Sequence, residues 1–84
     1  MPINIAIVED DADICQSLEE IINANDDLHC VAVFSSAEEF ISTFRHINVQ
    51  VVLMDINLPG KDGIATVAEM KPVKPAVQYL MCTV

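Results

Sequence analysis

The apolar residues of this chain gather in four short runs. These runs lie at residues 3–8, 29–34, 49–54 and 76–84. Short, nearly continuous apolar runs are typical of strands that are buried on both faces of a parallel sheet, whereas strands with one wet face alternate apolar and polar residues. The pattern therefore predicts four strands.

The segments that separate the runs carry helical signals. In the first segment the apolar residues recur at the spacing of one helical face, namely Ile14, Leu18, Ile21 and Ile22, and Asp10 or Asp11 is placed to cap the start. Ser36 and Glu39 fit a capping box at the start of a second helix. A third, shorter helix is expected to end before Pro72, because proline cannot continue a helix interior.

Strands that alternate with helices predict an α/β fold, namely a doubly wound parallel sheet with right-handed crossovers and helices on both faces. The length of 84 residues allows one small domain, with no internal repeat or linker. If the strand order is 2-1-3-4, the first and third strands are neighbours, about 4.8 Å apart.

The net charge of −9 is unevenly distributed along the chain. Residues 1–44 hold ten acidic residues and no Lys or Arg, whereas residues 45–84 hold three acidic residues and all four basic ones. So acidic a segment repels a phosphate backbone, and we expect it to make no direct contact with nucleic acid. The three scattered cysteines argue against a disulfide framework. With no signal peptide and no membrane-length apolar run, we expect a cytoplasmic protein without membrane contact.

Acidic residues directly follow two of the predicted strands. Glu9 and Asp10 follow the first strand, Asp55 follows the third, and Thr83 lies near the end of the fourth. Parallel strands all end at one edge of the sheet, where ligands bind at the point at which the strand order reverses. We therefore expect these side chains to share one pocket.

Clustered carboxylates repel one another, so either one of them is protonated or a cation lies among them. Residues 1–44 contain no Lys or Arg to serve as that cation. A hard divalent ion with oxygen ligands, such as Mg²⁺, is the natural solution. An aspartate beside Mg²⁺ can act as a nucleophile toward a phosphoryl group.

Each of these residues also has an ordinary structural explanation. Asp10 or Asp11 alone is more often a helix N-cap than a ligand, and Asp62 before a helix is a cap or turn residue. Thr83 alone is an ordinary β-branched strand residue. Asp55 is the hardest to explain in this way, because the strand before it is otherwise apolar. The combination of all these positions favours a functional site.

The stretches IAIVEDD, VVLMDINLPGKDG and YLMCTV resemble, in this order, the receiver (CheY-like) domain of two-component response regulators. The resemblance covers the whole chain and implies a flavodoxin-like sheet of order 2-1-3-4. It implies that Asp55 accepts a phosphoryl group, that Asp10 binds Mg²⁺ directly and that Glu9 acts through water. Asn57 would offer its backbone carbonyl to the metal, and Thr83 would be the switch hydroxyl. The implied donor is a phosphohistidine on a sensor histidine kinase, and the domain would be no enzyme beyond catalysing its own phosphorylation.

The resemblance also implies a longer domain. Receiver domains generally continue through a fourth helix, a fifth strand that carries a lysine for the phosphoryl group, and a fifth helix. We therefore expect residues 1–84 to be the N-terminal portion of a receiver domain, with impaired phosphorylation and switching. The fourth strand is then an exposed edge, through which we expect homo-oligomers such as dimers, or exchange of elements between chains. The motifs are compatible with a transcriptional regulator whose parent chain carries a DNA-binding effector.

Three other functions are compared with that of a phosphoacceptor receiver domain. Phosphohydrolases with an aspartate nucleophile resemble this layout, but they usually show D-x-D after the first strand, whereas the candidate here is Asp55-Ile56-Asn57 after the third. A non-phosphorylatable interaction module with a degenerate receiver site is a further alternative. Dinucleotide binding is excluded, because the chain has only Gly60 and Gly63 and no glycine-rich turn after the first strand.

Overall fold

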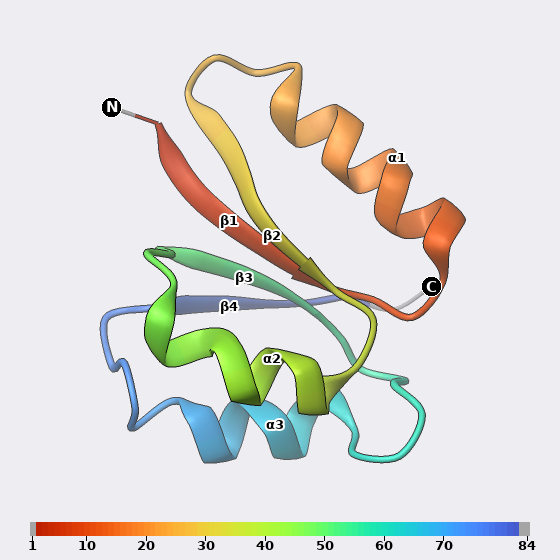
Figure 1. Cartoon of the computed structure of the whole chain (residues 1–84), viewed down its shortest axis with the longest axis vertical. Coiled ribbons are helices and arrows are strands. Elements are labelled where there is room, and N and C mark those ends of the chain that lie inside the picture. Colours follow the sequence, from red (N-terminus) through yellow and green to blue (C-terminus); the bar gives the residue numbers. More distant parts are fainter. Residues whose placement is uncertain (1, 83–84) are drawn as a thin grey trace.

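The computed structural model describes residues 2–82 and shows one parallel sheet between two layers of helices (Figure 1). The strands are β1 (Ile3–Val8), β2 (Leu28–Phe34), β3 (Val51–Asp55) and β4 (Gln78–Cys82). The helices are α1 (Ala12–Asn23), α2 (Ala37–Thr43) and α3 (Gly63–Met70), and a 3-10 turn, η1 (Phe44–His46), follows α2. The strand order is β2-β1-β3-β4, with every pair parallel. The predicted fold class and strand order are confirmed.

The two faces of the sheet carry separate apolar clusters. On one face, α1 covers a small cluster of Ile5, Ile7, Cys15 and Ile22. On the other face, α2 and α3 cover a larger cluster in which Phe40 and Phe44 are fully buried. The central strands β1 and β3 are largely buried on both faces of the sheet, which explains why their sequences are nearly continuously apolar.

A strand boundary and the exposure of one helix residue differ from the sequence predictions. The third strand was expected at residues 49–54, but β3 begins at Val51, since Val49 lies in the core before the strand starts. Ile21 was expected on the buried face of α1, yet its side chain is 69% exposed, because it lies one position away from the stripe that ends at Ile22. In both cases hydrophobicity alone was used to assign a residue, either to a strand or to the buried face of a helix.

Side-chain caps set where the helices begin. The backbone N–H groups of Asp13 and Ile14 donate to Asp11 Oδ1 at 3.0 and 3.2 Å, so Asp11 caps α1 and Asp10 is not needed there. Ser36 caps α2, accepting from the Glu39 N–H at 3.2 Å. The predicted capping box is incomplete, because the Glu39 carboxylate instead accepts from the hydroxyl of the preceding serine, Ser35, at 2.7 Å.

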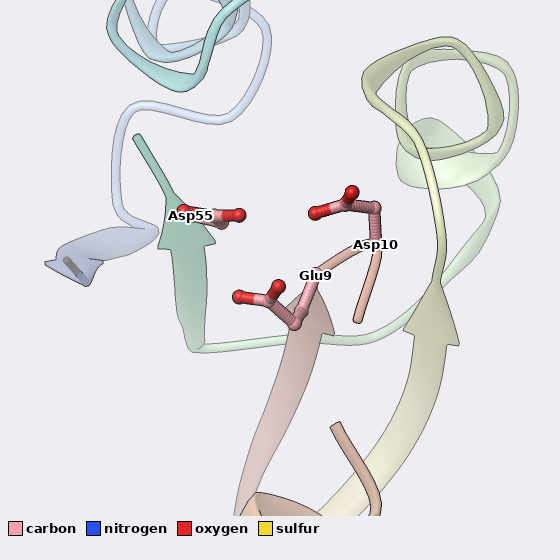
Figure 2. A group of neighbouring side chains, drawn as sticks. All are labelled: Glu9, Asp10 and Asp55. Atoms are coloured by element: carbon pink, nitrogen blue, oxygen red, sulfur yellow. The ribbon is translucent and has the colours of Figure 1, made fainter. Parts of the chain in front are cut away.

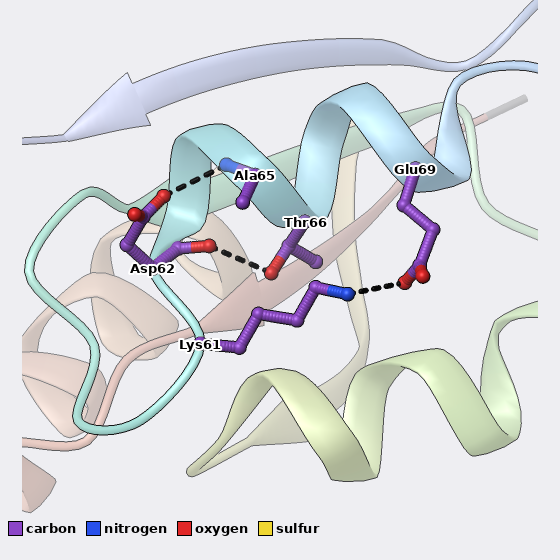
Figure 3. Close-up of polar contacts among 5 residues, drawn as sticks. All are labelled: Lys61, Asp62, Ala65, Thr66 and Glu69. Carbon is purple, nitrogen blue, oxygen red and sulfur yellow. Dashed lines mark hydrogen bonds and ion pairs between the residues drawn. The ribbon is translucent and has the colours of Figure 1, made fainter.

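The start of α3 is tied to the loop that leaves β3 (Figure 3). Asp62 caps this helix, as predicted, by accepting from the Ala65 N–H at 2.7 Å, and its carbonyl accepts from the Thr66 hydroxyl at 2.8 Å. Lys61 forms an ion pair of 2.7 Å with Glu69, which joins the loop to the last turn of α3. These contacts tie the end of the loop, Lys61 and Asp62, to α3.

Within residues 2–82, every helix is too short or too polar to span a membrane.

Candidate metal centre

Three carboxylates meet at the end of β1 and β3. Because these strands pair in parallel, with Val8 opposite Met54, the residues that follow them lie side by side. One carboxylate oxygen from each of Glu9, Asp10 and Asp55 lies within 4.8 Å of the others. Figure 2 shows the three carboxyl groups facing the same small space.

The local backbone holds two of these carboxylates in place. Glu9 Oε1 accepts from the N–H of Asp11 at 3.1 Å, and Asp55 Oδ1 accepts from the N–H of Asn57 at 3.0 Å. Glu9 is only 5% exposed and Asp55 only 6% exposed, whereas Asp10 is exposed at the mouth of the cluster. The cluster therefore has a buried inner part and one carboxylate that reaches solvent.

The pKa of Glu9 is raised, first because burial disfavours its charged form. The negative charges of Asp55 and Asp10 raise this pKa further, while the hydrogen bond from the Asp11 backbone lowers it. Negative charge is thus costly at the inner end of the cluster. A cation placed among the three carboxylates would remove this cost.

The donor set fits a hard cation. All three groups offer carboxylate oxygens, which are the ligands that Mg²⁺ prefers, and Mg²⁺ usually keeps several waters beside one or two carboxylates. Two oxygens bound to one Mg²⁺ lie about 3 to 4 Å apart, so small side-chain rotations within the observed 4.8 Å would place them on one ion. Asn57 lies in the turn directly after Asp55, and Thr83 lies outside the described residues.

The lysines of this chain are engaged elsewhere. Within residues 2–82, Lys61 pairs with Glu69, Lys71 donates to the carbonyl of Val77, and Lys74 donates to the carbonyl of Ile47. These three lysines are therefore paired away from the carboxylate cluster.

Sequence reasoning missed one neighbour of the site, Cys82. The register of β3 and β4 places Cys82 opposite Asp55, and the N–H of Ile56 donates to the Cys82 carbonyl at 3.1 Å. Burial raises the pKa of the Cys82 thiol, and the charges of Asp55 and Glu9 raise it further, so the thiol stays neutral. Only the strand register could have identified this residue, because nothing in its local sequence separates it from its neighbours.

Comparison with known proteins agrees with this geometry. The family model described as "Response regulator receiver domain" matches residues 5–84. A protein-glutamate methylesterase/protein-glutamine glutaminase from Shewanella frigidimarina is 33% identical over 75 residues, which are 89% of this chain and 19% of that protein. The transcriptional regulatory protein ZraR from Escherichia coli is 31% identical over 81 residues, which are 96% of this chain and 18% of that protein.

Solved structures of receiver domains have the same fold. The isolated receiver domain of RcsB from Salmonella enterica serovar Typhimurium superposes with a TM-score of 0.91 at 19% identity, covering 99% of this chain and 62% of that one. The BeF3-activated receiver domain of DrrB gives a TM-score of 0.85 at 26% identity, covering 99% of this chain and 67% of that one.

The chain belongs to the response regulator receiver domain family, since the family model covers nearly all of it. Receiver domains are the phosphoacceptor modules of two-component signalling, take their phosphoryl group from histidine kinases and bind Mg²⁺ at an acidic pocket. The chain spans about a fifth of the length of the curated relatives that it matches.

Proposed function

We propose that Asp55 is the residue that accepts the phosphoryl group, from a phosphohistidine on a sensor histidine kinase. The observation that carries this assignment is the convergence of three carboxylates within 4.8 Å at the ends of β1 and β3. Asp55 is the only one of the three that ends an otherwise apolar strand, and its buried carboxylate faces the other two. A buried charge in this position is costly unless the chemistry of the site uses it.

In the proposed reaction, a carboxylate oxygen of Asp55 attacks the phosphorus atom of the donor. A P–O bond forms, the P–N bond to the histidine breaks, and the imidazole keeps the electron pair and takes up a proton. The hydrogen bond from Asn57 to Oδ1 orients the carboxylate for this attack. Mg²⁺, when bound, offsets the negative charge of the transferring oxygens.

The proposed metal ligands are Asp10, by direct coordination, and Glu9, through a water molecule. This division is supported by exposure, because Asp10 lies at the open mouth of the cluster and Glu9 at its buried end. Asn57 would add its backbone carbonyl. Thr83 would supply the hydroxyl that turns toward the phosphoryl group after transfer.

The wider role follows from the same proposal. The domain catalyses only its own phosphorylation, acts in the cytoplasm beside its kinase, and forms the N-terminal portion of a longer receiver domain. A longer receiver domain is supported by the comparison with RcsB, because this chain covers 62% of the isolated RcsB receiver chain. A DNA-binding effector in the parent protein would suit a transcriptional regulator such as ZraR, with which this chain shares 31% identity.

The experiment that tests Asp55 uses Mg²⁺ and a small acyl phosphate as donor. We expect intact-mass spectrometry to show one phosphoryl adduct that base removes and that the Asp55→Asn variant lacks. Asp62→Asn is the matched control, since it makes the same change in the same loop and asparagine also caps helices well. Continuous phosphate release without an adduct would favour the phosphohydrolase. Mg²⁺ binding without any adduct would indicate a receiver site with the impaired phosphorylation expected from the sequence, and loss of both would favour the interaction module.

A further inference from the structure

A groove of about 440 Å³ lies between α1 and the end of β2. Cys15, Gln16 and Glu19 line it from the helix, and Val33 and Ser35 line it from β2 and the residues that follow. Glu9 and Asp10 also border it, so the groove adjoins the carboxylate cluster. Because β2 is an edge strand, no neighbouring strand covers Val33, which is 42% exposed.

The groove combines an apolar floor with a rim that consists mostly of hydrogen-bond acceptors. Cys15 and Val33 provide apolar surface. Of the side-chain donors at the rim, the Ser35 hydroxyl donates to Glu39 at 2.7 Å and one N–H of the Gln16 amide donates to Glu20 at 3.4 Å. The carboxylates of Glu9, Asp10 and Glu19 remain as acceptors.

No cation of this chain neutralises those carboxylates within residues 2–82. Residues 1–44, which supply every lining residue, contain no Lys or Arg. The three lysines are bonded elsewhere, and Arg45 follows α2 on the opposite face of the sheet from α1 (Figure 1). Glu9 and Asp10 are assigned to the metal site, so Glu19 is the lining carboxylate that is available to a cation from another molecule.

We propose that this groove binds an arginine or lysine side chain from a basic segment of a partner protein. These side chains only donate hydrogen bonds, and they carry an aliphatic stem below the charged head. The stem would lie over Val33 and Cys15, with the cation beside Glu19. The volume falls at the lower end of the range of about 300–1,000 Å³ for small-ligand sites, which suits one long side chain with its adjoining backbone.

This proposal goes beyond phosphotransfer. Glu19, Gln16, Val33 and Ser35 play no part in the chemistry proposed for Asp55. A basic partner held in the groove would nevertheless lie beside the phosphoacceptor site, because Glu9 and Asp10 belong to both. The groove thus adds a docking surface for a basic protein next to the site that is modified.

The test is a titration of the isotopically labelled chain with N-acetylarginine amide, followed by backbone amide NMR. We expect saturable shifts at Gln16, Glu19, Val33 and Ser35, and none with the neutral citrulline analogue. The Glu19→Gln variant should weaken binding about threefold, as expected for one lost exposed ion pair. The same change in α2, Glu38→Gln, should leave the affinity unchanged.

Four outcomes would overturn the proposal. Equal shifts with citrulline would show that charge is irrelevant, and equal weakening by Glu38→Gln would show general attraction to an acidic chain. Loss of binding in Asp55→Asn, with no effect of Glu19→Gln, would place the probe in the carboxylate cluster. The same shifts appearing without probe as protein concentration rises, and vanishing in Arg45→Gln, would assign the groove to a second copy. Failure of Asp55 phosphorylation would not alter any of these readouts.

Discussion

Gly63 lies directly against the backbone of Asp55. A Cβ atom added to Gly63 would be 2.1 Å from the Asp55 carbonyl oxygen and 2.9 Å from its carbonyl carbon. The N–H of Gly63 also donates to the Ile56 carbonyl at 3.2 Å. The first residue of α3 is therefore packed onto the end of β3, and the position of this helix and that of Asp55 depend on each other.

A Gly63→Ala substitution should consequently destabilise the chain by about 3 kcal/mol, because backbone rather than a flexible side chain must move to admit the methyl group. Gly60→Ala is the control in the same loop. Gly60 has a φ of +78°, but a Cβ there would meet only the flexible Glu38 side chain, at 3.7 Å, so alanine should cost only about 1–2 kcal/mol. Urea unfolding compares the two, and an equal or smaller loss for Gly63→Ala would contradict the close approach.

Mg²⁺ should stabilise the folded chain. At a free concentration of ten times the dissociation constant, we expect a gain of about 1.4 kcal/mol in the free energy of unfolding relative to metal-free buffer. Asp10→Asn should abolish this gain, measured by thermal unfolding with and without a chelator. Asp11→Asn should retain it, because Asp11 caps α1 and asparagine is an equally good cap. Loss of the gain in both variants would place the ion elsewhere.

Glu9 should make the stability of the metal-free chain depend on pH. The pKa of Glu9 is raised above 4.5, so its carboxyl group binds a proton more tightly in the folded chain than in the unfolded chain. The stabilising contribution of protonated Glu9 is fully present below the ordinary pKa and is lost as the pH rises through the pKa of the folded chain. Glu9→Gln should therefore stabilise the chain near neutral pH, and its advantage should shrink toward pH 4.5. Glu38→Gln, on the exposed surface of α2, should show no such trend in urea unfolding.

Tyr79 should limit stability in alkaline solution. Among the described residues, its hydroxyl is a buried group without a hydrogen-bond partner, and burial raises its pKa from 10.0 to about 12. The stability that depends on a protonated Tyr79 hydroxyl is present below pH 10 and is lost as the pH rises toward 12. Tyr79→Phe should gain about 1 kcal/mol at neutral pH and lose less stability across that alkaline window. Destabilisation by this substitution at neutral pH would show that the hydroxyl has a partner.

The edge of the sheet at β4 should promote self-association. Leu80 is 56% exposed and Met81 is 38% exposed on this strand, which pairs with β3 on one side only among the described strands. Leu80→Lys should shift the mass measured by light scattering toward the monomer. Ile64→Lys is the control, because Ile64 is 61% exposed but lies on α3. If the unsubstituted chain of residues 1–84 stays monomeric over a wide concentration range, the prediction is wrong.

Local sequence patterns were enough to predict the helices, the strands and the class of site. Apolar runs predicted the strands, because a strand buried on both faces tolerates few polar residues, and Asp55 stood out against that background. Acidic residues after the first and third strands predicted a shared pocket, because parallel strands end at one edge. These signals are local or depend only on the general geometry of parallel sheets.

The residues that surround the carboxylate cluster became known only from the folded structure. It assigned the cap of α1 to Asp11, which leaves Asp10 for the cluster, and it placed Cys82 opposite Asp55. It also brought Gly63 onto the Asp55 carbonyl. Such relationships depend on strand register and on how closely helix and strand pack, and both result from contacts between segments far apart in the chain.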